Sequence, residues 1–260
     1  MRTSGWLLFP AFALAAACSK SGDRAAEGSG SDTTVAARAA GPMAIVTVLY
    51  NAPKDTAAFE RYYANTHLPL LMANQREIGF VRTDFTKFAS TADGKRPTYY
   101  RQAELYFNSM DDVKKGTGTA GFKKVADDLA NFAAGGITGM VARTTNPHVQ
   151  GATSAPAAIV TVIYKTPKDT AAFESYYAEK HLPLVEAGQG QIGFERAEFT
   201  KFDSNLDGSK PARYRQAELY FASMDALKKG TATPAFKEVA DDLPKFATGG
   251  FDALVGAETK

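Results

Sequence analysis

The sequence contains one stretch of about a hundred residues twice, and this duplication constrains the fold more than any other feature. The first copy begins with AIVTVLY at Ala44 and the second with AIVTVIY at Ala158. No insertion or deletion separates the copies up to Val141 and Val255, so one constant offset pairs equivalent residues. A solenoid needs at least about three repeats, so two copies of this length indicate a duplicated domain.

Each copy predicts the order strand, helix, strand, strand, helix, strand. The expected helices begin after residues that commonly serve as N-caps, namely Asp55, Ser109 and Thr119. Pro69 is expected to end or kink the first helix near His67 or Leu68. That order indicates a ferredoxin-like α+β fold, with four antiparallel strands and two helices on one face. The expected strands of the first copy are 44–50, 80–88, 99–107 and 137–142.

The face of the sheet that the helices leave uncovered is expected to carry an unusual set of polar and aromatic side chains on its third strand. Simple alternation places Tyr100, Gln102, Glu104 and Tyr106 on that face, together with their counterparts Tyr214, Gln216, Glu218 and Tyr220 in the second copy. Two such faces turned toward one another would form a chamber with a few polar groups, which is typical of small-molecule sites. The linker 145–156 can extend roughly 40 Å, enough for the second copy to face the first.

The N-terminal segment predicts export. A basic start precedes an apolar run of about a dozen residues that is too short to span a bilayer. It ends Leu14-Ala15-Ala16-Ala17-Cys18, which resembles a bacterial lipoprotein signal; the alternative is an ordinary secretory signal. The resemblance implies lipidation of Cys18 and, because Ser19 follows, an outer-membrane anchor facing the periplasm. The expected organisation is a signal (1–18), a disordered tether (19–42), domain 1 (43–144), the linker (145–156) and domain 2 (157–260).

Composition excludes several classes of site. Cys18 is the only cysteine, which rules out an internal disulfide or a cysteine-based metal site. The net charge of +2 comes from interspersed charges, so nucleic acid is not an expected partner. The letters G-x-G-x-x-G occur at residues 116–121 of copy one, but they follow an expected helical stretch and not a strand, which is not the context of a dinucleotide fingerprint. No G-x-S-x-G elbow is present, and we predict no cofactor and no metal.

The segments PKDTAAFERYYANTHLPL, RQAELYF and VADDLANFAAGG, together with their second copies, resemble the EthD-domain family, a branch of the dimeric α+β barrel superfamily. The resemblance covers both copies. It implies that the two domains form within one chain the barrel that single-copy members form from two chains, so that the protein is expected to be monomeric. Family members are described as reductases or ether-degradation accessory proteins, which implies an oxidoreductase as one possibility.

His67 and His181 are the first catalytic candidates. Each follows Phe59 and Tyr63, or their counterparts, at helical spacing, so it should point toward the sheet. A position at a helix end would favour imidazolium, and a histidine titrating near neutrality suits proton transfer. The alternatives are a histidine that only satisfies terminal carbonyls, or a metal or haem ligand.

Glu104 and Glu218 are the second candidates, because a carboxylate in a partly buried chamber has a raised pKa. The alternative is an ion pair with Arg82 or Arg196 on the neighbouring strand. Asp127-Asp128 and Asp241-Asp242 are expected to be solvated; the alternatives are that one aspartate of each pair pins the helix end, or that the pair binds a metal. The candidate ligand-binding residues, which could equally serve only in packing, are Tyr63, Tyr177, Tyr100, Tyr214, Gln102, Gln216, Tyr106 and Tyr220.

Three functions remain open on the sequence alone. The first is acid/base chemistry, or EthD-type reduction, on a small apolar or aromatic molecule. The second is a carrier or sensor that binds such a molecule without turnover. The third is a structural protein whose chamber is filled by its own side chains.

Overall fold

The computed structural model describes residues 43–146 and 158–259, all of which belong to one compact unit, Ala39–Lys260. The predicted signal with Cys18, the tether and residues 147–156 of the predicted linker lie outside the described residues. Thr145 and Asn146 were expected in the linker but belong to the last strand of the first copy. No helix in the described ranges has the length and apolar composition needed to cross a membrane.

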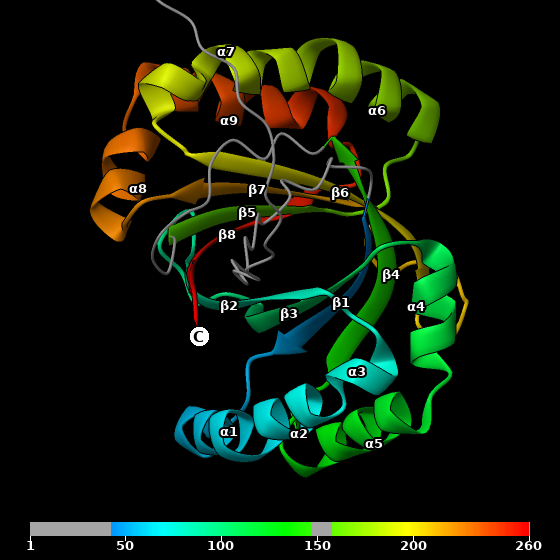
Figure 1. Cartoon of the computed structure of the whole chain (residues 1–260). Helices are drawn as coiled ribbons and strands as arrows, with labels where there is room; N and C mark the ends of the chain where they lie inside the picture. The colour runs from blue at the N-terminus through cyan, green and yellow to red at the C-terminus, as the bar shows by residue number, and fades with distance from the viewer. Residues whose placement is uncertain (1–42, 147–157, 260) are drawn as a thin grey trace, which may run out of the picture. The chain divides into compact units, whose positions relative to one another are not determined.

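Both copies have the expected strand and helix order, as Figure 1 shows. The first copy comprises β1 (Ala44–Asn51), α1 (Thr56–Tyr62), η1 (Tyr63–His67), α2 (Leu68–Ala73), α3 (Gln75–Ile78), β2 (Arg82–Thr91), β3 (Tyr99–Phe107), α4 (Met110–Thr117), α5 (Ala120–Asp128), η2 (Leu129–Asn131) and β4 (Ile137–Asn146). The second copy comprises β5 (Ala158–Tyr164), α6 (Thr170–Tyr176), η3 (Tyr177–His181), α7 (Leu182–Ile192), β6 (Arg196–Asn205), β7 (Arg215–Phe221), α8 (Met224–Thr231), α9 (Pro234–Phe246) and β8 (Phe251–Glu258).

The eight strands form one closed antiparallel barrel in the order β1-β3-β2-β8-β5-β7-β6-β4. Two ladders join the copies, with β2 pairing with β8 and β4 with β6. Closure satisfies the outer strands of both copies, which would otherwise be open edges. The predicted fold is confirmed: two ferredoxin-like units complete a dimeric α+β barrel within a single chain.

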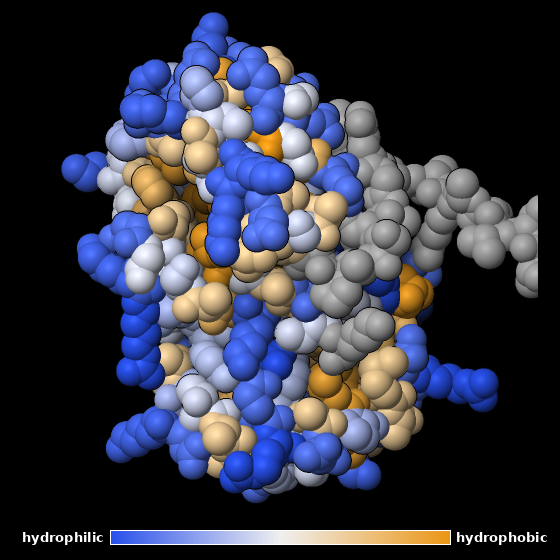
Figure 2. Space-filling view, turned by 90° about the vertical axis from the view of Figure 1, so that its left-hand side faces the viewer, coloured by the Kyte–Doolittle hydropathy of each residue, from blue (hydrophilic) through white to orange (hydrophobic). Residues whose placement is uncertain are grey.

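The apolar core has three layers. One cluster fills the space between the outer sheet face of copy one and its helices, and a second does the same in copy two. A third lies inside the barrel and combines residues of both copies, such as Ile45, Met140 and Ile163. In Figure 1 the helices of the two copies therefore cover opposite sides of the barrel. One outer face of the molecule is mainly hydrophilic, with hydrophobic residues in small areas between charged ones (Figure 2).

The local signals for the helix starts are confirmed. The side chains of Asp55, Ser109 and Thr119 each accept a hydrogen bond from the backbone N–H three residues later. Each cap satisfies one of the backbone donors that a helix leaves free at its start.

The helix that carries His67 does not end at Pro69. It widens into a single π turn, η1, in which the backbone N–H of Leu68 donates to the carbonyl of Tyr63, and it then continues as α2. Pro69 lacks an N–H and would clash with a carbonyl of a regular α-helix, and a π turn just before it relieves that conflict. The same turn, η3, precedes Pro183 in copy two.

Candidate functional site

Both histidines lie between the helices and the outer face of the sheet, on the side away from the barrel interior. His67 and His181 are the last residues of the two π turns, and each is 3% exposed. The expectation that they point toward the sheet is therefore correct. The expectation that each lies at the end of a helix, where the helix dipole would favour imidazolium, is wrong, because α2 and α7 continue the helix beyond them.

Each histidine bonds an aspartate from the second helix of its own copy. His67 Nδ1 lies 2.9 Å from Asp128 Oδ2, and His181 Nδ1 lies 2.9 Å from Asp242 Oδ2. The prediction that these aspartates are solvated is wrong for both, since they are 9% and 4% exposed. It holds for their neighbour Asp127, which is exposed and pairs with a lysine.

The aspartates are themselves held in place. The hydroxyl of Tyr62 donates to Asp128 at 2.8 Å, and that of Tyr176 donates to Asp242 at the same distance. Lys245 adds an ion pair to Asp242 at 3.1 Å. These contacts fix the carboxylate behind the imidazole, as second-layer carboxylates do in histidine-based sites.

Opposing effects set the protonation of this pair. Burial lowers the pKa of His181, and the hydrogen bond and charge of Asp242 only partly offset that; His67 behaves in the same way. Burial opposes ionisation of Asp242, but hydrogen bonds from His181, Tyr176 and Lys245 lower its pKa overall. A neutral imidazole therefore faces a charged carboxylate. Because a carboxylate only accepts hydrogen bonds, Nδ1 carries the proton and Nε2 keeps its lone pair.

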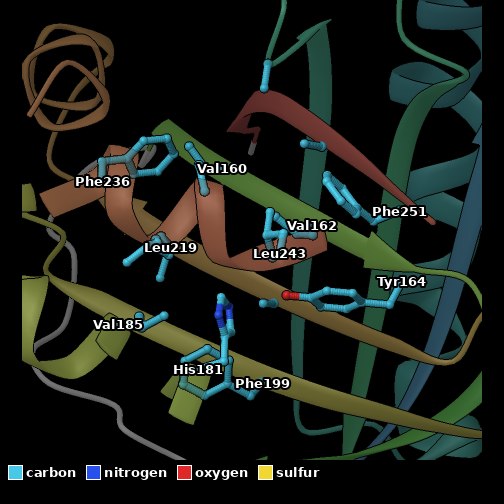
Figure 3. A pocket seen from close by; sticks show the side chains of 15 residues that line it. Val160, Val162, Tyr164, His181, Val185, Phe199, Leu219, Phe236, Leu243 and Phe251 are labelled. Atoms are coloured by element: carbon cyan, nitrogen blue, oxygen red, sulfur yellow. The ribbon is translucent and has the colours of Figure 1, made fainter. Parts of the chain in front are cut away.

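In copy two this histidine lines a cavity of about 180 Å³. The imidazole of His181 and the hydroxyl of Tyr164 both point into it, as Figure 3 shows. The Tyr164 hydroxyl is buried and has no hydrogen-bond partner among the described residues. Burial raises the pKa of Tyr164, so the hydroxyl stays protonated and can donate. The remaining lining is apolar and includes Val160, Val162, Val185, Phe199, Leu219, Phe236, Leu243 and Phe251.

The equivalent cavity of copy one is much smaller, at about 50 Å³. It is lined by His67, by Tyr50, which corresponds to Tyr164, and by Tyr63. Space for an organic molecule therefore exists in copy two and not in copy one.

The barrel interior holds the predicted carboxylates. Glu104 accepts hydrogen bonds from Thr47, from Tyr106 and, across the barrel, from Gln216 at 3.1 Å. Glu218 mirrors it with Gln102 at 3.0 Å. Glu104 and Glu218 are each 1% exposed, so no open chamber surrounds them.

The predicted ion pairs of these glutamates are wrong. Arg82 lies 3.1 Å from Glu198 of the other copy and stacks on the ring of Tyr106, and Arg196 pairs with Glu258 and stacks on Tyr220. Burial and neighbouring carboxylates raise the pKa of Glu104 well above its usual value, and burial with the charge of Glu198 raises that of Glu218 to about 7. Hydrogen-bonded side chains thus occupy the barrel interior, although the amide oxygens of Gln102 and Gln216 have no hydrogen-bond partner among the described residues.

The predicted tyrosines divide between the two sides of the sheet. Tyr106 and Tyr220 lie in the barrel as expected. Tyr100 does not, because a bulge in β3 pairs Tyr50 with Arg101 and Asn51 with Tyr99, which leaves Tyr100 as the extra residue on the helix side, against Phe59. The alternation prediction is therefore wrong for this residue.

Tyr214, its counterpart, is also on the helix side. It packs on Phe173, and its hydroxyl donates to Glu174. Tyr63 and Tyr177 are buried between helix and sheet, and their hydroxyls have no hydrogen-bond partner in the described part of the chain.

Sequence reasoning missed Asp128, Asp242 and Tyr164. The signal for Tyr164 was available, since the apolar run of the first strand is followed by a tyrosine in both copies, Tyr50 and Tyr164. No comparable signal existed for the aspartates, which lie 61 residues from their histidines.

Comparison with known proteins supports the same architecture. An uncharacterized 11.0 kDa protein from the thcB-thcC intergenic region of Rhodococcus erythropolis is 41% identical over 96 residues, which cover 36% of this chain and 88% of that protein. A proposed monooxygenase from Fusobacterium nucleatum shares the fold, with a TM-score of 0.54 and 13% identity over 84% of this chain and 93% of that one. An anthrone oxidase-like protein matches with a TM-score of 0.56 and 11% identity over 84% and 92%.

These two likenesses concern the fold alone. The EthD domain itself matches twice, at residues 51–136 and 165–250, and together the two matches span more than half of the chain. The chain therefore belongs to the EthD-domain family, with two EthD domains in tandem.

Proposed function

We propose that the copy-two cavity binds a small, mainly apolar molecule bearing one polar group, and that His181 removes a proton from it. The observation that carries the proposal is the Tyr164 hydroxyl, which is buried without a hydrogen-bond partner among the described residues and shares an otherwise apolar cavity with the imidazole of His181. A buried hydroxyl without a partner costs about 1–3 kcal/mol, so a ligand that completes its hydrogen bond gains that energy.

The geometry suits a carbonyl compound with an acidic C–H bond. The Tyr164 O–H would donate a hydrogen bond to the carbonyl oxygen, and His181 Nε2 would accept the proton from the neighbouring carbon. The electron pair of that C–H bond moves onto the oxygen as an enolate, while Asp242 stabilises the imidazolium. Return of the proton to a different atom of the ligand gives an isomer and needs no redox partner.

Exchange of the α-protons of cyclohexanone in deuterated water, followed by proton NMR, tests this directly. We expect the intact protein to accelerate exchange, His181→Gln to reduce the acceleration by about 10²–10⁴-fold and Tyr164→Phe by about 10²–10³-fold. His67→Gln is the matched control and should have little effect, because its cavity is too small. An unchanged rate in His181→Gln would overturn the proposal.

The same experiment separates the binding alternative. Cyclohexanone that shifts the His181 resonances without any catalysed exchange would identify a carrier or sensor. Tyr164→Phe should fold at least as stably as the parent chain, because it removes a buried group that has no partner, so a lost rate in this variant is not a folding defect.

The location of this activity is a separate proposal, which rests on residues 1–19 alone. We propose a lipid anchor on Cys18 and a periplasmic site at the outer membrane, as the Leu-Ala-Ala-Ala-Cys sequence indicates. Intact mass of the protein extracted from its membranes should show acyl chains on Cys18 and none in Cys18→Ser. A mature chain with an unmodified Cys18 would contradict it.

A further inference from the structure

The two cavities differ in size although their walls are nearly the same. Equivalent positions in the two copies carry the same residue at the histidine, the strand tyrosine and most of the apolar lining. The difference that adds bulk to copy one lies mainly at the turn that follows the second strand of the opposite copy. Ala92, from copy one, lines the cavity of copy two, whereas Leu206, from copy two, lines the cavity of copy one.

Each turn is held over the other copy by the same backbone bond. The N–H of Ala92 donates to the carbonyl of Ala253 at 2.8 Å, and the N–H of Leu206 donates to the carbonyl of Gly139 at 3.0 Å. Both Ala92 and Leu206 are exposed as well as cavity-lining, so each lies at a cavity mouth. Barrel closure therefore gives each copy's cavity a mouth residue that the other copy supplies.

The facing residues have changed together. A Cβ atom at Gly139 would lie 2.4 Å from Leu206 Cδ1, so Leu206 keeps this side-chain position because glycine faces it, and it would have to shift opposite a larger residue. In copy two an alanine, Ala253, occupies the position equivalent to Gly139, and it faces the smaller Ala92. The two copies thus have different versions of one contact. It is filled in copy one, by Leu206 against Gly139, and open in copy two, where Ala92 faces Ala253.

We infer that this position sets the size of ligand each copy accepts, so that Leu206 closes the copy-one site and Ala92 leaves the copy-two site open. The inference rests on the proposed function for the identity of the ligand but not for the gate. Leucine adds three carbons at the mouth of copy one relative to alanine. Phe251 in place of Ile137 adds three carbons to the wall of copy two, so it does not account for the larger cavity there. Leu71, which replaces Val185, adds one more carbon and should keep an opened copy-one cavity somewhat smaller.

The test exchanges the two versions. Leu206→Ala should open the copy-one cavity. Ala92→Leu should close the copy-two cavity, and Ala253→Gly should make room for the new leucine, as Gly139 does for Leu206. A chain carrying all three changes should move the site from copy two to copy one. Crystals of each variant under xenon pressure report cavity occupancy without any functional ligand, because an apolar cavity of about 150 Å³ binds xenon.

We expect xenon in copy two of the parent chain, in both copies of Leu206→Ala, and only in copy one of the triple variant. Cyclohexanone should then shift the imidazole proton resonances of His181 in the parent chain, of both histidines in Leu206→Ala, and of His67 alone in the triple variant. We expect cyclohexanone to bind a closed site at least tenfold more weakly than an open one. The same xenon occupancy in the parent chain and in both variants would overturn the inference that this position sets the size of each cavity. Xenon that follows the changes while cyclohexanone binds nowhere would leave the gate standing and reject the proposed ligand.

Discussion

At the scale of single residues, the chemistry of the candidate site depends on one contact between an imidazole and a carboxylate. His181 is buried against Phe246 with ring centroids 4.6 Å apart, and Asp242 is its hydrogen-bond partner. Burial disfavours the charged imidazole and the carboxylate favours it, so the net pKa depends on both. The lowered pKa keeps Nε2 unprotonated at neutral pH, which is the state a general base requires.

Asp242→Asn should lower the pKa of His181 further. The amide keeps the size of the side chain but removes the charge that raises the imidazole pKa, while burial continues to lower it. The exchange activity, which needs neutral Nε2, should then begin its rise at lower pH. A proton–carbon NMR titration of the imidazole groups measures the pKa, with His67 in the same sample as the unchanged control. A raised pKa for His181 would contradict the assignment of the proton to Nδ1.

At the scale of elements, some site features followed from sequence periodicity and others could not. The helical spacing of Phe59, Tyr63 and His67 correctly predicted which way His67 points, because the rings of Tyr63 and His67 stay in contact although η1 spans these residues. Alternation likewise placed Glu104 in the barrel. Both patterns depend only on backbone geometry within one element.

The failures arose where one element meets another. Tyr100 was misplaced because a bulge, which no pattern in β3 announces, shifts the alternation by one residue. Asp128 is buried, contrary to the prediction, because α5 packs beside the histidine helix, and no pattern within α5 shows that contact. The partner of Arg82 is Glu198, on the other copy, and was not deducible from the neighbouring strand. Contacts between copies depend on barrel register, which a single sequence does not reveal.

At the scale of the whole molecule, duplication places in one chain the two halves of a closed barrel. The copies exchange hydrogen bonds inside it, from Gln102 to Glu218 and from Gln216 to Glu104. They also supply each other's cavity mouths through Ala92 and Leu206. Because both halves are encoded separately, one cavity can close while the other stays open, which identical chains in a symmetric dimer could not achieve.

The buried glutamates make the stability of this barrel depend on pH. Burial and the charge of Glu198 raise the pKa of Glu218 to about 7 in the folded chain, from an ordinary value of 4.5. Such a group stabilises the fold fully below its unfolded pKa, and that contribution is lost as the pH rises through about 7. Glu218→Gln mimics the protonated acid at every pH: its amide oxygen can accept from Thr161 and Gln102, and its NH2 group can donate to the hydroxyl oxygen of Tyr220. Relative to this variant, the parent chain should therefore lose unfolding free energy between about pH 5 and pH 8, by a few kcal/mol at most, because one pKa unit corresponds to about 1.4 kcal/mol.

Urea denaturation at both pH values measures the difference, and the exposed Glu238→Gln substitution controls for loss of a surface carboxylate. A constant difference between parent and Glu218→Gln across this range would show that Glu218 is already ionised inside the barrel.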